Sequence, residues 1–347
     1  MNQLERVIAA VSFQPTDRPP VIPQVFAHTA VLNGAHIIDY VRSGDLAAIY
    51  QLQALHFYRY DAVFGVLDLC IEPEVIGATI RFPQDNYPSV SHPPFTTDAA
   101  FDHLTLPDMK TSGRVPHVLT AIRTLRKDLN DMVPVIGLVQ GPMTLALHLL
   151  GTENALYLAA DDPERFEQLL TYTTRIAHQY GIAQLNAGAH IIMIFEPGAS
   201  PEVIPPSFFS QCIAPRLTQL FASFKQSGSY ANWLHIAGNV GSILNQYDNI
   251  GVNIANFDYC VSPQKACQEL AQVCLNGNIS SVSFIADTPE MIIKKSLELL
   301  KTFAERRGFI LSSGCEIPPE SPPANIAAMV HSSVQFSQGK GDDVKCQ

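Results

Sequence analysis

The chain has 347 residues, of which 47% are hydrophobic and 16% are charged, and its formal net charge is −10. This length and apolar content are sufficient for a large buried core. The acidic balance and the absence of a long basic run argue against a nucleic-acid partner, which requires clustered Lys and Arg. No stretch approaches the roughly 18 apolar residues of a membrane span, and the first residues lack the apolar segment of a secretory signal. Because seven irregularly spaced cysteines fit a reducing compartment, we expect a cytoplasmic protein with no membrane contact.

Short apolar runs, each bounded by polar residues, Gly or Pro, recur along the chain and predict buried strands. In chain order they are residues 21–26, 61–66, 133–139, 190–195, 232–236, 252–257, 272–275 and 309–311. Amphipathic segments of helical period lie between them, for example residues 163–185 and 288–304. Asp162 and Thr288 each precede a Pro and are typical helix N-caps.

Continuous apolar strands flanked by helices predict a parallel sheet that is covered on both faces. Eight such units predict an α/β fold of the (β/α)8 TIM-barrel type, in a single domain. We place the barrel at residues 1–340 and a polar C-terminal tail at residues 341–347. The alternative is a doubly wound open sheet, although no Gly-rich phosphate fingerprint follows the first predicted strand.

Polar residues stand at the carboxyl end of nearly every predicted strand, where barrel enzymes place their active sites. They are Gln24, His28, Asp68, Gln140, Glu196, His235, Asp258, Asn276, Asn278 and Cys315. Plain loop starts favour Gly, Ser and Lys, so we interpret the set as a functional ring. Imidazole and thiolate are ligands that zinc prefers, which makes His235 and Cys315 a candidate metal pair. The alternative for each is an ordinary core residue.

Several segments carry recognisable motifs in a fixed order. They are 15–21 (P-x-D-R-x-P-V), 67–69 around Asp68, 140–146 (G-P-x-T-L-A), 256–259, 275–278 and 309–325. Together they resemble the uroporphyrinogen decarboxylase superfamily, which includes methylcobamide:coenzyme M methyltransferases and related corrinoid-dependent methyltransferases. The resemblance runs over almost the whole chain and implies the barrel fold.

The same resemblance separates two activities. Decarboxylases of the superfamily hold the carboxylates of a porphyrinogen with arginines in an R-Q-A-G-R-Y segment, and residues 25–30 of this chain contain no Arg. Decarboxylases also carry G-H-G-I where residues 314–317 read Gly-Cys-Glu-Ile. Both departures favour the methyltransferase branch.

Methyltransferases of this branch bind zinc through an H-x-C motif and a Cys in a distant G-C segment. His235 and Cys315 match the first and last ligands, whereas Ala237 replaces the middle Cys. The resemblance therefore implies a zinc ion on His235 and Cys315, and we take Glu196 as the third ligand. The alternatives are Asp258 or Cys260 as third ligand, or loss of the metal.

The resemblance implies zinc-assisted transfer of a methyl group between a corrinoid (cobalamin) and a small thiol, ether or amine. A partner protein would carry the corrinoid, because this chain has no D-x-H-x-x-G segment to ligate cobalt. Asp68 and His28 are the expected catalytic groups. The expected substrate-binding residues are Tyr87, Gln140, Asn239, Asp258 and Asn278. Glu72 and Glu74, which follow Asp68, are interpreted as solvated loop charges. A carboxylate ligand in place of Cys makes the site harder, so we expect an ether, amine or unusual thiol to be preferred over the usual coenzyme thiol.

Two other functions stay open. One is a decarboxylase-like carboxy-lyase that acts on a tetrapyrrole, with basic residues recruited from other loops. The other is a non-catalytic binding barrel that has lost the metal. The decarboxylase resemblance suggests a homodimer, and the methyltransferase resemblance permits a monomer.

Overall fold

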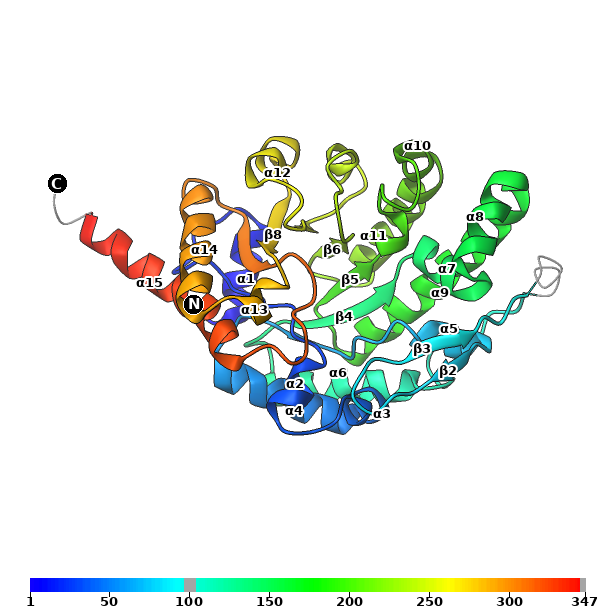
Figure 1. Ribbon diagram of the computed structural model, residues 1–347, viewed down its shortest axis with the longest axis horizontal. Coiled ribbons are helices and arrows are strands. Elements are labelled where there is room, and N and C mark those ends of the chain that lie inside the picture. Colours follow the sequence, from blue (N-terminus) through cyan, green and yellow to red (C-terminus); the bar gives the residue numbers. More distant parts are fainter. Residues whose placement is uncertain (97–103, 344–347) are drawn as a thin grey trace.

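A computed structural model describes residues 1–96 and 104–343. Within these residues, seven parallel strands form one curled sheet in the order β1-β4-β5-β6-β7-β8-β9 (Figure 1). The strands are β1 (Val63–Phe64), β4 (Val135–Gln140), β5 (Ile191–Phe195), β6 (Asn232–His235), β7 (Ile254–Asn256), β8 (Cys274–Ile279) and β9 (Phe309–Ser313). An antiparallel hairpin of β2 (Thr79–Arg81) and β3 (Ser89–His92) lies outside this sheet.

The first predicted strand is reduced to one bridging residue. Val21 forms a parallel bridge with Leu311 of β9, and its carbonyl accepts a hydrogen bond from the Asp61 amide at 2.8 Å. Pro20 and Pro23 have no N–H to donate, so the ladder cannot continue on either side. This segment fills the eighth position between β9 and β1, and the predicted (β/α)8 barrel is confirmed in this form.

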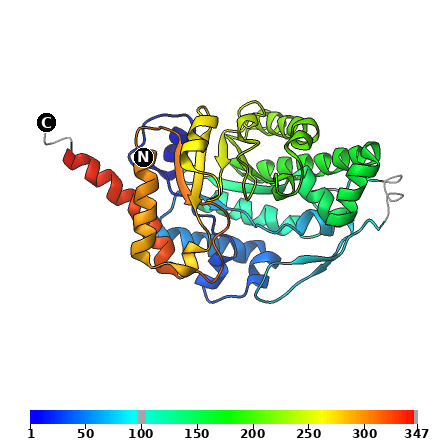
Figure 2. The same ribbon diagram turned by 45° about the horizontal axis from the view of Figure 1, so that its top comes forward.

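Helices surround the curled sheet on its outer side (Figures 1 and 2). They are α1 (Gln3–Val11), α2 (His28–Leu32), α3 (Ile37–Arg42), α4 (Gly44–Tyr58), α5 (Ile71–Ile76), α6 (Val115–Leu129), α7 (Pro142–Leu150), α8 (Thr152–Asp161), α9 (Pro163–Ala187), α10 (Pro206–Phe208), α11 (Ala214–Gln226), α12 (Pro263–Glu269), α13 (Ser283–Ala286), α14 (Pro289–Thr302) and α15 (Pro323–Asp343). Helix α15 packs against α14, and its end extends away from the barrel. The tail predicted to begin at residue 341 therefore starts inside α15, and residues 344–347 lie outside the described part.

Local sequence signals explain where several elements begin. The side chain of Asp162 accepts the Arg165 amide at the start of α9, and Thr288 caps α14 in the same way. Strands β4, β5 and β6 are buried along their whole length, as their continuous apolar runs predict. None of the helices in the described part of the chain is both long enough and apolar enough to span a membrane.

Strand β8 is longer than predicted. It continues from residue 274 through Gly277 to Ile279, whereas the predicted strand ended at residue 275. A Cβ atom on Gly277 would lie 2.6 Å from the carbonyl oxygen of Phe257, so glycine is what allows β8 to lie so close to β7 here. The longer strand carries Asn278 to the end of the sheet where the other predicted site residues lie.

Candidate active site at the carboxyl ends of the strands

The structure brings His235 and Cys315 together. His235 is the last residue of β6, and Cys315 follows β9 after one glycine. The Nε2 atom of His235 lies 3.7 Å from the Sγ atom of Cys315, and the imidazole packs on the Phe195 ring with 4.4 Å between centroids. Burial lowers the pKa of His235 to about 3 and raises the pKa of the Cys315 thiol to about 11. Both side chains are therefore neutral at pH 7 when no cation is bound.

The separation of these two atoms suits two ligands of one zinc ion. Typical Zn–N and Zn–S bonds with a tetrahedral angle place the nitrogen and sulfur about 3.6 Å apart. Ala237, which is partly buried beyond the end of β6, carries no donor atom. Within residues 1–96 and 104–343, no three His, Cys, Asp or Glu side chains gather closely enough to hold a metal. The chain thus fits two positions of a zinc site and supplies no third in this arrangement.

The structure does not bring Glu196, the expected third ligand, to this pair. Its carboxylate accepts hydrogen bonds from the amides of Met143 at 2.7 Å and Thr144 at 3.0 Å, at the start of α7. A Cβ atom on Gly141 would lie 2.2 Å from the Glu196 carboxyl carbon, so this glycine leaves room for it. Burial raises the pKa of Glu196 to about 7. The geometry is that of a carboxylate at a helix N-terminus, where the helix dipole favours negative charge.

Asp258 connects the loop that carries Ala237 to the loop that carries Cys315. Its Oδ2 atom accepts the Gly238 amide at 3.0 Å, and its Oδ1 atom accepts the Tyr259 amide at 2.7 Å. A Cβ atom on Gly314 would lie 2.5 Å from Oδ1 of Asp258, so the β9 loop touches this carboxylate. A carboxylate oxygen has lone pairs beyond those used by one hydrogen bond, so Asp258 keeps acceptor capacity here.

Two of the predicted amides lie at the same end of the sheet in different surroundings. The Nδ2 atom of Asn278 donates to the carbonyls of Asp258 at 3.3 Å and Val261 at 3.0 Å, which fixes the loop after β7. Asn239 is exposed, and its backbone N–H donates to the Glu202 carboxylate at 3.4 Å. Asn278 is therefore a buried support, whereas Asn239 faces solvent.

Asp68, at the opposite rim after β1, is held by an arginine. Arg114, which precedes α6, donates from Nη1 to Asp68 and from Nε to Glu74 at 2.6 Å. Asp68 also accepts the Cys70 amide at 2.8 Å. Because two carboxylates surround this guanidinium, Arg114 brings no free positive charge to the site.

His28 is held at both ring nitrogens. Nδ1 lies 2.7 Å from the carbonyl oxygen of Pro319, and Nε2 lies 2.8 Å from the Tyr58 hydroxyl. Burial lowers the pKa of this imidazole. His28 therefore fastens the loop after β9 to α4 as a neutral ring.

Gln140, at the end of β4, belongs to a buried network with Glu72. Glu72 accepts the backbone amide of Gln140 at 2.8 Å and its side-chain amide at 3.1 Å, and Gln140 Oε1 lies 2.7 Å from Nδ1 of His148. Burial raises the pKa of Glu72 to about 7. The sequence suggested a solvated loop charge for Glu72. That interpretation was wrong, because α5 turns this side chain into the barrel.

Tyr87 connects the loop between β2 and β3 to the segment after β9. Its hydroxyl donates to Glu316, the residue after Cys315, and accepts the Ala27 amide at 2.9 Å. Burial raises the pKa of Glu316 to about 8. Sequence reasoning missed Glu316 and Arg114 as members of the site. A carboxylate directly after the strand-end cysteine was the available signal for Glu316.

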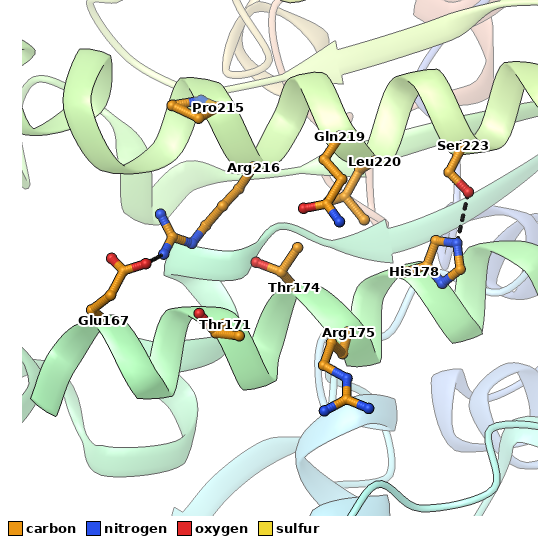
Figure 3. A pocket seen from close by; sticks show the side chains of 10 residues that line it. All are labelled: Glu167, Thr171, Thr174, Arg175, His178, Pro215, Arg216, Gln219, Leu220 and Ser223. Atoms are coloured by element: carbon orange, nitrogen blue, oxygen red, sulfur yellow. Dashed lines mark hydrogen bonds and ion pairs between the residues drawn. The ribbon is translucent and has the colours of Figure 1, made fainter. Parts of the chain in front are cut away.

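A groove of about 610 Å³ lies apart from these residues, between α9 and α11. Figure 3 shows two polar pairs at this groove: Arg216 with Glu167, and Ser223 with Nε2 of His178 at 2.7 Å. None of the residues predicted for the functional site lines it. The candidate site therefore remains at the carboxyl ends of the strands.

Comparison with known proteins agrees with the fold. The family model described as uroporphyrinogen decarboxylase (URO-D) matches residues 2–335. A methylcobamide:CoM methyltransferase from Methanosarcina barkeri is 29% identical over 94% of this chain and 95% of that protein. A uroporphyrinogen decarboxylase from Xanthomonas oryzae pv. oryzae is 26% identical over 97% of this chain and all (100%) of that protein.

Solved structures show the same fold. A methyltransferase from Methanosarcina mazei superposes with a TM-score of 0.88 at 27% identity, covering 97% of this chain and 99% of that one. A B12-independent methionine synthase from Shewanella sp. W3-18-1 reaches a TM-score of 0.60 at 14% identity, over 88% of this chain and 89% of that one. At that identity the second likeness concerns the fold alone.

Proposed function

The chain belongs to the uroporphyrinogen decarboxylase family, and from that membership we propose that it is a corrinoid-dependent methyltransferase. It would move a methyl group between a corrinoid on a partner protein and a small thiol, ether or amine. The observation that carries the proposal is the 3.7 Å approach of His235 Nε2 to Cys315 Sγ at the carboxyl end of the barrel. The relatives named as methyltransferases support it, since they match the chain over nearly its full length.

In this proposal His235 and Cys315 hold a zinc ion. When bound, zinc supplies Lewis acidity, which lowers the pKa of a thiol or polarises the heteroatom that carries the methyl group. Asp68 and His28 orient the substrate from the opposite rim, each fixed by the partners described above. The corrinoid protein docks over the mouth of the barrel, where the strand ends open.

We propose Asp258 rather than Glu196 as the third protein ligand. Moving Glu196 would leave two amides at the start of α7 without acceptors. Asp258 accepts only loop amides, those of Gly238 and Tyr259. Asp258 already lies between the loops that carry Ala237 and Cys315. Zinc accepts carboxylate oxygen at distances comparable to those of imidazole nitrogen.

The direct test is methyl transfer from free methylcobalamin to a panel of thiols and amines, and from methyl ethers to cob(I)alamin, which forms methylcobalamin and releases the alcohol. The absorbance of the cobalt–carbon bond reports both reactions. We expect turnover by the wild-type protein and its loss in His235→Ala and Cys315→Ala. Cys267→Ala is the matched control, since this half-buried free cysteine lies outside the site. Equal activity in wild type and both site variants would contradict the proposal.

Ala237→Cys tests the origin of the substrate preference. The added thiolate restores the H-x-C motif and makes the site softer, so we expect tighter zinc retention and faster methylation of thiols relative to amines. The measurement is the ratio of kcat/KM values for a thiol and an amine in wild type and variant. An unchanged ratio would count against a role for residue 237 in selecting the substrate.

Tetrapyrrole decarboxylation is the second candidate, because some relatives of the chain are named uroporphyrinogen decarboxylases. The local charges disfavour it, since Arg114 at the mouth is already neutralised by Asp68 and Glu74. A porphyrinogen with many carboxylates needs unpaired cations. We expect no loss of carboxyl groups when uroporphyrinogen is incubated with the protein, and carboxyl loss would reverse the order of the two candidates.

A further inference from the structure

The second ring nitrogen of His235 is buried without a hydrogen-bond partner among the described residues. The first, Nε2, faces the Cys315 sulfur. An imidazole that offers its Nε2 lone pair to a thiol or a metal carries its proton on Nδ1. A buried N–H group normally has an acceptor, and in metal sites the second-nitrogen partner fixes the orientation of the ring.

Asn256 offers an acceptor on the neighbouring strand. Residues Leu234 of β6 and Ala255 of β7 are paired in the sheet, and His235 and Asn256 are the next residue of each strand. The Oδ1 atom of Asn256 is also buried without a partner in the described part of the chain. The register thus places a partnerless donor and a partnerless acceptor at the same level of adjacent strands.

Contacts to β9 show that both side chains point into the barrel. His235 reaches Cys315, which follows β9, and Asn256 Nδ2 reaches the carbonyl of Ser313 at 3.5 Å. The same Nδ2 atom donates to Oδ1 of Asn276 at 3.0 Å. These bonds fix which end of the Asn256 amide is nitrogen, so its oxygen is the group left to accept a proton.

We propose that Asn256 is a positioning residue for His235. Its Oδ1 atom accepts the Nδ1 proton through one bridging water, since the two atoms do not bond to each other directly in this arrangement, and this bridge keeps Nε2 turned toward Cys315. The role in zinc binding rests on the proposed function, but the hydrogen bond itself does not require zinc. An amide fixes the tautomer without adding charge, whereas a carboxylate at this position would add a buried negative charge beside the pair.

Gln24 is the competing acceptor, because its Oε1 atom is likewise buried without a partner among the described residues. Its Nε2 atom donates to the Ser313 carbonyl at 3.3 Å, which holds it beside β9. Strands β7 and β8 separate β9 from β6 in the sheet order, whereas Asn256 is on the strand next to His235. Gln24→Ala is therefore a matched control that removes one buried amide without touching the proposed bond.

The first test uses the metal-free wild-type protein with ¹⁵N-labelled histidine. A two-bond ¹H–¹⁵N correlation spectrum reports which ring nitrogen carries the proton, and comparison with His235→Ala assigns the signal. We expect the Nδ1–H tautomer. The Nε2–H tautomer would overturn the proposal, and this result needs no Asn256 variant to fold.

The second test measures zinc affinity by competition with a chelator. Loss of a partner at the second nitrogen typically lowers metal affinity about 10–100-fold, so we expect that loss in Asn256→Ala. Asn256→Asp keeps an acceptor and should retain wild-type affinity or exceed it, and Gln24→Ala should match wild type. Unchanged affinity in Asn256→Ala, or an equal loss in Gln24→Ala, would overturn the proposal. Absence of zinc from wild type would instead count against the proposed function. The proposed hydrogen bond would then be tested by the tautomer measurement alone.

Discussion

Glu72 and Glu196 are fully buried carboxyls, and burial raises the pKa of each to about 7. Both accept backbone amides at the edge of the site: Glu72 from Gln140, and Glu196 from Met143 and Thr144. In the unfolded chain such carboxyls ionise near pH 4.5. The native state therefore holds more protons than the unfolded state between about pH 4.5 and pH 7.

This difference gives the pH dependence of stability a definite sign. When the native state binds more protons, the free energy of unfolding falls as the pH rises from about 4.5 to about 7. For Glu72 alone the change is roughly 3 kcal/mol. Glu72→Gln removes the titrating group, so urea unfolding of the variant between pH 5 and pH 8 should show a smaller decline than wild type. Parallel stability curves for the two proteins would contradict this.

Residue chemistry predicted the His235–Cys315 pair because both residue types are zinc ligands and both follow predicted strands. It could not find Arg114, Glu316 or Asn256 as members of the site. Their roles depend on partners distant in sequence: Arg114 binds Asp68, and Glu316 binds Tyr87. For the same reason it misjudged Glu72, whose partner Gln140 lies beyond the β2–β3 hairpin.

At the scale of elements, α7 and β5 are joined by a single side chain. Glu196, the residue after β5, accepts the first amides of α7, and Gly141 leaves the space that its carboxyl group occupies. The G-P-x-T-L-A motif was recognised in the sequence as a helix start. Its glycine is explained by a side chain that is distant in sequence, which the motif alone could not reveal.

Gly141→Ala should therefore destabilise the protein although its backbone is extended and unstrained (φ −74°). The new methyl group overlaps the Glu196 carboxyl, and overpacking of this kind costs about 1–3 kcal/mol. The measurement is the melting temperature of the variant and of wild type in thermal unfolding. Gly339→Ala is the control, since no atom lies within 4 Å of the added Cβ in α15 and helix propensity favours Ala. Equal melting temperatures for Gly141→Ala and wild type would contradict the role given to this glycine.

At the scale of the whole molecule, eight strand-and-helix units were predictable because each strand is a continuous buried run. The irregular parts were not. The first strand shrinks to one residue between prolines, and β8 runs through Gly277 because β7 lies close to it. The β2–β3 hairpin is largely exposed, so no buried apolar run marked it. The lengths of these strands thus depend on contacts with neighbouring segments, which cannot be read from the sequence of the strand itself.

Asp61 closes the barrel at the opposite end from the site. It is fully buried and accepts the Val21 amide and the guanidinium groups of Arg6 and Arg18, each at 2.7–2.8 Å. Removing this charge takes away the carboxylate partner of the half-buried Arg18 and leaves the buried Arg6 with Asp17 alone.

Asp61→Asn should therefore lower the free energy of unfolding by about 3–5 kcal/mol, as measured by urea titration. Asp128→Asn, at an exposed position on α6, should stay within about 0.5 kcal/mol of wild type. Similar losses in both variants would contradict a special role for Asp61.

The central claim is that His235 and Cys315 hold zinc for methyl transfer. The most direct measurement is the zinc content of the purified protein by elemental analysis, with His235→Ala and Cys315→Ala measured beside it. We expect about one zinc ion per chain in wild type and its loss in both variants. Wild-type protein that contains no zinc, even after reconstitution, would contradict the claim and move the centre of the site to Asp68 and the loop after β1.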